Sequence, residues 1–130
     1  MFNKQKKHFK SKLTGVQRMV WDLEFKRFKT REIREEVRQT YDNQKSRQFS
    51  LKEQLNNKEL KKEELANIKD EIERLDVQLK RYEEQMKGLD LEVEGSKPTN
   101  ELPDGHDGIN QTLDSLRELQ QMIKSYIDEL

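Results

Sequence analysis

The sequence predicts an all-α protein, an elongated coiled coil of long helices that ends in a C-terminal antiparallel helical hairpin. Only 31% of the 130 residues are apolar and 40% are charged, with a net charge of zero, so a compact core around an active site is not expected. Ala, Glu, Lys, Leu and Arg make up 59 of the residues, a composition typical of coiled coils. Composition leaves open a disordered polyampholyte, and an unbroken heptad repeat over 65–89 decides against it.

A basic flexible arm is predicted over residues 1–13. Its only large apolar side chains before Leu13 are Phe2 and Phe9, and it shows almost no helical periodicity. We therefore expect it to be disordered until it binds a partner. Its basic residues are Lys4, Lys6, Lys7, Lys10 and Lys12.

An amphipathic basic helix is predicted over 14–46. Thr14 and Gln17 have the spacing of a capping box at its start, and Ser50 with Glu53 repeats that spacing, so a break is expected at 46–50. The apolar residues of this helix fall on two nearly opposite faces, although packing along a single seam would need only one. One face holds Leu13, Val16, Met19, Val20 and Leu23, and the other holds Trp21, Phe25 and Phe28.

A long heptad helix is predicted over 50–90. From Leu65 onward its apolar residues alternate steps of three and four, which keeps one seam facing a partner helix. The seam positions are Leu65, Ile68, Ile72, Leu75, Leu79, Tyr82, Met86 and Leu89.

A loop over 91–107 and a C-terminal helix over 108–130 complete the chain. The loop holds both prolines, and Asp107 is suited to cap the helix. We expect the helix to pack back on the heptad helix or onto a partner, and its broad apolar stripe fits contact with two neighbouring helices. Its seam positions are Ile109, Leu113, Leu116, Ile123 and Ile127, and Leu119, Met122 and Tyr126 widen the stripe.

Charge is divided along the chain, with a net +8 over 1–47 and a net −8 over the remainder. The lysines of the arm and an arginine stripe are therefore candidates for binding an anionic partner. Nucleic acid, an acidic protein surface and the chain's own acidic half are all open as that partner, and a membrane surface is the weaker option. The stripe consists of Arg27, Arg31, Arg34 and Arg38.

Three aromatic residues form the sharpest candidate site. Trp21, Phe25 and Phe28 have the i, i+4, i+7 spacing with which a helix inserts anchors into a partner's groove. Packing against the protein's own later helices is the alternative.

The inventory of reactive side chains argues against enzymatic chemistry. The sequence has no cysteine, and its two histidines, His8 and His106, fall in the predicted arm and loop. The loop sequence around His106 lacks the ligands of a calcium loop, so neither a metal nor a cofactor is expected.

We therefore expect a non-enzymatic structural, scaffolding or adaptor protein that forms homo-oligomers or joins a larger assembly. The alternative is a nucleic-acid-binding accessory protein, such as a packaging or ribosome-associated factor. No apolar stretch is long enough for a signal peptide or a membrane span, so we expect a location in the cytoplasm or inside a particle.

Overall fold

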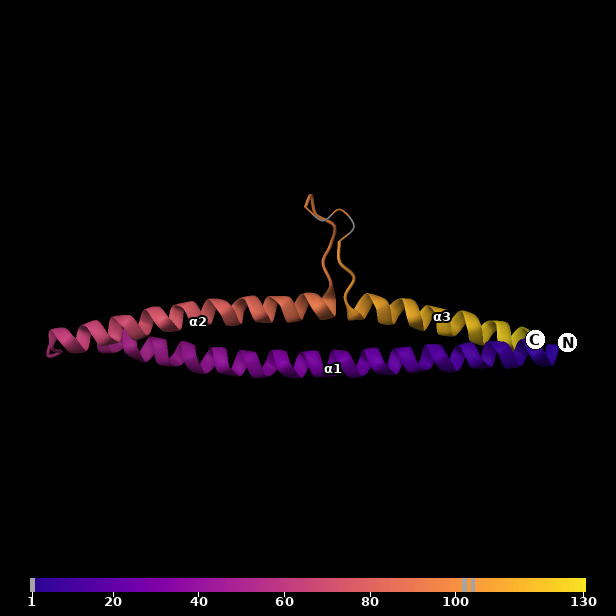
Figure 1. Ribbon diagram of the computed structural model, residues 1–130, viewed down its shortest axis with the longest axis horizontal. Coiled ribbons are helices and arrows are strands. Elements are labelled where there is room, and N and C mark those ends of the chain that lie inside the picture. Colours follow the sequence, from indigo (N-terminus) through magenta and orange to yellow (C-terminus); the bar gives the residue numbers. More distant parts are fainter. Residues whose placement is uncertain (1, 102, 104) are drawn as a thin grey trace. The chain divides into compact units, whose positions relative to one another are not determined.

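The described residues form three helices joined by two connections (Figure 1). The computed structural model describes residues 2–101, 103 and 105–130. The helices are α1 (Phe2–Gln54), α2 (Lys62–Glu94) and α3 (Ile109–Glu129). Among the described residues the only β-type pairing is one isolated bridge. The predicted all-α class is confirmed.

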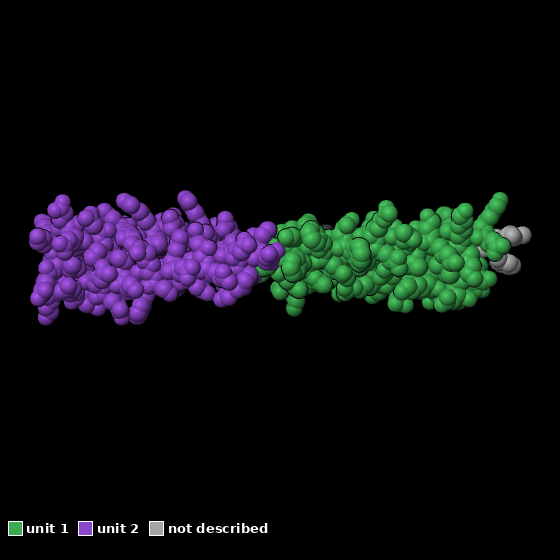
Figure 2. Space-filling model, turned by 90° about the horizontal axis from the view of Figure 1, so that it is seen from below, with its two compact units in different colours: residues 1–31, 90–130 green, residues 32–89 purple. Residues whose placement is uncertain are grey.

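The chain divides into two compact units (Figure 2). Unit 1 comprises residues 1–31 and 90–130, and unit 2 comprises residues 32–89. Each unit has its own buried residues, and they are described separately.

Helix α1 differs from the two segments that the sequence predicts. The expected flexible arm over 1–13 is helical from Phe2 onward. Thr14, the expected N-cap, lies inside the helix, and its hydroxyl donates a hydrogen bond to the Lys10 carbonyl oxygen at 3.0 Å. A threonine hydroxyl can bond back to the preceding turn in this way, so the residue does not have to begin a helix.

The break expected at 46–50 occurs later. Helix α1 continues through Ser50 to Gln54, and the connection to α2 follows it. The Asn57 side-chain oxygen accepts a hydrogen bond from the Glu59 backbone N–H at 3.1 Å, which stabilises a turn after the helix has ended. This connection, within unit 2, reverses the chain direction between α1 and α2.

The second connection is closed at its base. Helix α2 runs to Glu94, beyond the predicted end at 90, and ends where Gly95 adopts φ +72° and donates to the Leu91 carbonyl at 2.7 Å. Ser96 and His106 then exchange two backbone hydrogen bonds of 2.7 and 3.0 Å, forming a narrow neck.

Helix α3 begins one residue later than Asp107 would place it. Its N-cap is Gly108, whose backbone N–H donates to the Gln111 side chain at 2.9 Å. The same side chain donates to the Glu94 carbonyl at the end of α2. A Cβ at residue 108 would collide with the backbone of 93–95, so glycine permits this close approach.

The core of unit 1 joins α3 to the first part of α1. Val20, Val93, Ile109 and Leu113 form one buried cluster, with Leu23 and Leu116 packed against it. The prediction that the last helix folds back on the 65–89 heptads is not confirmed, because α3 buries its apolar face against α1 within unit 1.

In unit 2 the last part of α1 packs antiparallel to α2. Leu51, Leu75 and Leu79 are buried. The order of the contacts sets the direction: Tyr41 bonds to Glu83, whereas residues later in α1 bond to earlier residues of α2.

Candidate docking surface

The three aromatic residues singled out by the sequence lie outside the core cluster of unit 1. Trp21, Phe25 and Phe28 are 78%, 63% and 62% exposed. Val20, next to Trp21 in the chain, is buried, because successive residues of a helix point in directions about 100° apart. The Lys29 ammonium lies 5.7 Å from the centre of the Phe25 ring, within cation–π range.

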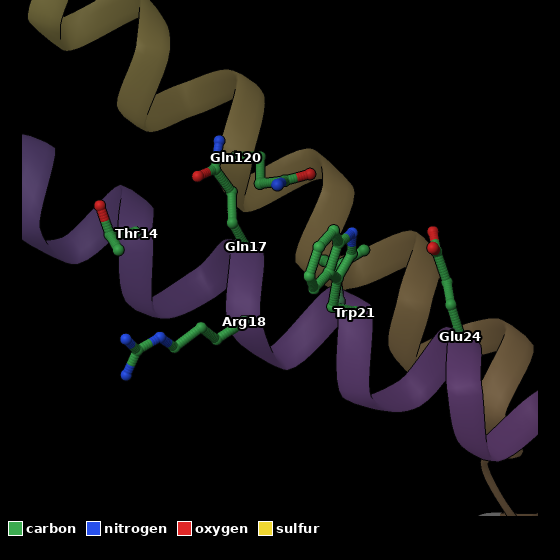
Figure 3. A pocket seen from close by; sticks show the side chains of 7 residues that line it. Thr14, Gln17, Arg18, Trp21, Glu24 and Gln120 are labelled. Carbon is green, nitrogen blue, oxygen red and sulfur yellow. The ribbon is translucent and has the colours of Figure 1, made fainter.

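A pocket lies beside Trp21, between α1 and α3 of unit 1 (Figure 3). Its volume is about 470 Å³. Gln120 of α3 lines it and is half-buried. The Arg18 side chain points away from α3 (Figure 3), toward the outer side of α1. The pocket therefore has a polar wall next to the largest exposed aromatic side chain.

An apolar groove lies between the same two helices. It has a volume of about 460 Å³, and Gly15 of α1 lines it together with apolar side chains from both helices. The Phe9 and Tyr126 rings stack near its end with centroids 5.8 Å apart. The exposed apolar residues that line it are Met19, Leu119, Met122 and Tyr126. The described residues thus leave exposed the part of the α3 apolar stripe, Leu119, Met122 and Tyr126, that the sequence predicts to contact a second neighbouring helix.

The seam positions predicted on α2 and α3 are all shielded from solvent. On α2, Leu75 and Leu79 are buried and the other six predicted residues are half-buried. On α3, Ile109, Leu113 and Ile123 are buried, while Leu116 and Ile127 are half-buried. Val77, which lies off the predicted seam, is exposed.

The shielded seam of α1 extends well beyond the apolar face that the sequence predicts at 13–23. Its positions also alternate steps of three and four, but polar side chains occupy many of them between 27 and 48. The shielded positions are Lys6, Phe9, Leu13, Val16, Val20, Leu23, Arg27, Thr30, Arg34, Val37, Tyr41, Gln44, Gln48, Leu51 and Leu55. Extending the three-four steps of 13–23 along the chain would have found this seam.

The polar seam residues of unit 2 are held by specific partners. The buried Gln48 side chain donates to the Asp76 carboxylate at 2.7 Å and to the Ile72 carbonyl at 3.2 Å. Gln44 donates to the Tyr82 hydroxyl at 3.5 Å. The bonds of Gln48 satisfy its buried amide N–H groups, whereas the buried side-chain oxygen of Gln44 has no hydrogen-bond partner among the described residues.

Most of the four candidate anion-binding arginines are engaged within the protein. Arg27 of unit 1 donates to the Asn110 side chain at 3.0 Å. Arg38 of unit 2 pairs with Glu35 and Asp42. Arg34 is half-buried and also interacts within the protein, and Arg31 is exposed.

The hydrogen bond from Arg38 acts on the pKa of the Glu35 carboxyl. It holds the pKa of the Glu35 carboxyl below its ordinary value, and the positive charge of Arg38 acts in the same direction. Both groups lie at the surface of α1.

The lysines of the first helical turns are more accessible than the arginines. Lys4, Lys7, Lys10 and Lys12 are exposed, and Lys6 is half-buried. None of the five forms an ion pair with the residues that the structure describes. No acidic residue precedes Asp22, so this part of α1 carries a strong positive charge.

Within the described part of the chain, no three His, Asp or Glu residues are grouped closely enough to hold a metal ion. No described helix is long and apolar enough to cross a membrane. The chain matches no protein-family model, no curated protein and no solved structure.

Proposed function

We propose that this chain is a non-enzymatic coiled-coil scaffold or adaptor protein that acts by oligomerising and by docking protein partners. The observation that carries the proposal is the exposure of Trp21, Phe25 and Phe28 on the side of α1 that its own core does not use. A sequence with so few apolar residues places its only tryptophan and two phenylalanines in water.

The coiled-coil part of the proposal is supported by the shielded heptad positions on all three helices. Most of the apolar side chains are committed to these seams. The aromatic face is therefore surplus to the packing of the chain, and surplus aromatic residues are the usual anchors of protein interfaces.

The energetic gain from covering this face is large enough to support binding. Burying one large apolar side chain is worth about 1.5–3 kcal/mol, so three would contribute on the order of 5 kcal/mol or more. Part of this is spent on the lost freedom of the two partners. The aromatic face can therefore anchor a partner, while a polar rim sets its orientation.

The test is a triple variant, Trp21→Ser with Phe25→Ser and Phe28→Ser, compared with Phe49→Ser. Phe49 is a matched control because it is 64% exposed on the same helix but lies in unit 2. We expect the triple variant to lose co-purifying proteins and higher oligomers, measured by quantitative cross-linking and sedimentation, while its helicity by circular dichroism stays unchanged. Equal retention of partners by the triple variant and the control would contradict the proposal.

Nucleic-acid binding is a second candidate, favoured by exposed lysines in the acid-free start of α1 that form no ion pair with any described residue. A variant with Lys4, Lys7 and Lys10 replaced by Ala should bind RNA or DNA more weakly, and its dependence of log K on log salt should be shallower by about one unit for each lost phosphate contact. The control is Arg38→Ala, whose side chain is already paired within α1. Binding that does not change with salt would rule out this candidate.

A further inference from the structure

We infer that the outer face of α1 in unit 1 binds a second copy of the chain as an antiparallel, two-fold-symmetric pair centred near Val20. This inference deepens the proposed function and rests on it, because it names the occupant of the face that carries Trp21 and Phe25. In such a pair, residues of the packed face that lie equally far along the helix from Val20, in opposite directions, face each other across the interface.

The face is a second row of heptad-spaced positions, on the side of α1 opposite its seam. Every position in the row is exposed. The row consists of Ser11, Gly15, Arg18, Asp22, Phe25 and Lys29, again with alternating steps of four and three. That spacing allows two identical helices to pack along their length.

The antiparallel arrangement places Gly15 of one copy opposite Phe25 of the other. A Cβ added at Gly15 would have no neighbour within 4 Å, so the packing of the chain itself does not require glycine there. Glycine inside a helix lowers its stability roughly two- to fivefold relative to alanine. A glycine at this position is explained if the exposed Phe25 ring of a second copy packs directly against the Gly15 backbone.

The charges on the face are complementary in the same arrangement. Arg18 faces Asp22 of the second copy, and the symmetry repeats the pair. Within the described residues neither side chain forms an ion pair of its own.

Apolar side chains flank these pairs close to the two-fold axis. The two Trp21 residues come together on one side and the two Met19 residues on the other, and both are exposed in the single chain. A parallel pair would bring Arg18 next to Arg18, so charge selects the antiparallel direction. The surface thus combines an aromatic anchor, a glycine hollow and opposite charges around one axis.

The first test compares Gly15→Ala with Gly88→Ala. Gly88 is a matched control because it also lies inside a helix with open space around its Cβ. Both substitutions should raise thermal stability at low concentration. Only Gly15→Ala should weaken self-association, by about tenfold or more, because its methyl group displaces the Phe25 ring of the second copy.

Sedimentation equilibrium and fluorescence provide the two readouts. Trp21 is the only tryptophan, so its emission should shift to the blue as concentration rises and the dimer forms. If the full-length chain stays monomeric at every concentration, or if Gly15→Ala and Gly88→Ala associate equally, the inference is wrong.

The second test exchanges the charges. Arg18→Asp alone and Asp22→Arg alone should each dimerise roughly tenfold more weakly. An equimolar mixture of the two variants should recover heterodimers, because the new carboxylate at position 18 of one chain then faces the new guanidinium at position 22 of the other. An ion pair within one helix cannot produce rescue between chains, so absence of rescue would overturn the two-fold arrangement.

These outcomes are separable from those of the proposed function. A monomeric chain whose Trp21, Phe25 and Phe28 variant still loses other proteins would leave the docking function intact and reject the second copy as occupant. A dimer that forms as inferred but captures no other protein would support the inference and confine the docking function to self-assembly.

Discussion

Replacement of Leu113 by alanine should destabilise unit 1 strongly. Leu113 is 0% exposed and lies in the cluster with Val20, Val93 and Ile109. It is one of only three buried residues on α3, so few other contacts can compensate for its loss. Truncating a buried leucine costs about 2–5 kcal/mol, and we expect about 3 kcal/mol here, roughly a hundredfold in the unfolding constant.

Leu119→Ala is the control for this prediction, because Leu119 lies on the same helix but is 41% exposed. Its cost should stay below about 1 kcal/mol. Urea unfolding followed by circular dichroism would give both values, and hydrogen exchange of the α3 amides would locate the effect. Similar losses for the two variants would mean that α3 does not bury its seam against α1 as described.

Three further predictions concern local features. Gly95→Ala should open the neck, because a φ of +72° costs alanine about 1–2 kcal/mol and the added Cβ would collide with the His106 carbonyl oxygen. Hydrogen exchange of the amides at the neck should become faster, and unchanged exchange would contradict the prediction. Arg38→Gln should raise the pKa of Glu35 toward its ordinary value. Because the pKa of Glu35 is lowered in the folded protein, the Glu35 carboxylate stabilises the fold at pH values above its ordinary pKa, and this stabilisation is lost as the pH falls through the lowered pKa. Carboxyl NMR titration of both proteins would detect the change. Gln48→Leu should stabilise unit 2 by about 1 kcal/mol, because an apolar side chain replaces a buried polar one. If urea unfolding shows a loss of stability, the hydrogen bonds of Gln48 contribute more than the apolar side chain would.

The sequence predicted the seams wherever apolar residues mark them. All the residues proposed for the seams of α2 and α3 are shielded, because Leu and Ile at heptad spacing leave few other ways to bury apolar area. The same reasoning failed on α1 between 27 and 48. Arg27, Thr30 and Gln48 occupy shielded positions there, and the Arg27 guanidinium and the Gln48 amide are satisfied by partners that hydropathy cannot indicate.

Local end signals were the least reliable part of the prediction. Thr14 and Ser50 both resemble N-caps, yet α1 passes through them. Adding a residue to an existing helix is favourable, whereas starting a new helix is costly, so a capping sequence alone does not end a helix. The aromatic candidates Trp21, Phe25 and Phe28 were identifiable from spacing, but whether the chain's own helices cover them depends on which faces pack, and only the structure gives that.

The neck between α2 and α3 has a practical consequence for engineering. Its base is held by the Ser96–His106 bridge and by Gln111, which links the end of α2 to the start of α3. The chain beyond that base does not determine how the two helix ends meet, and a longer loop adds little entropic cost. The protein should therefore tolerate a peptide tag or a small domain inserted between the exposed Asn100 and Glu101, and the contacts between the two helix ends should stay as they are.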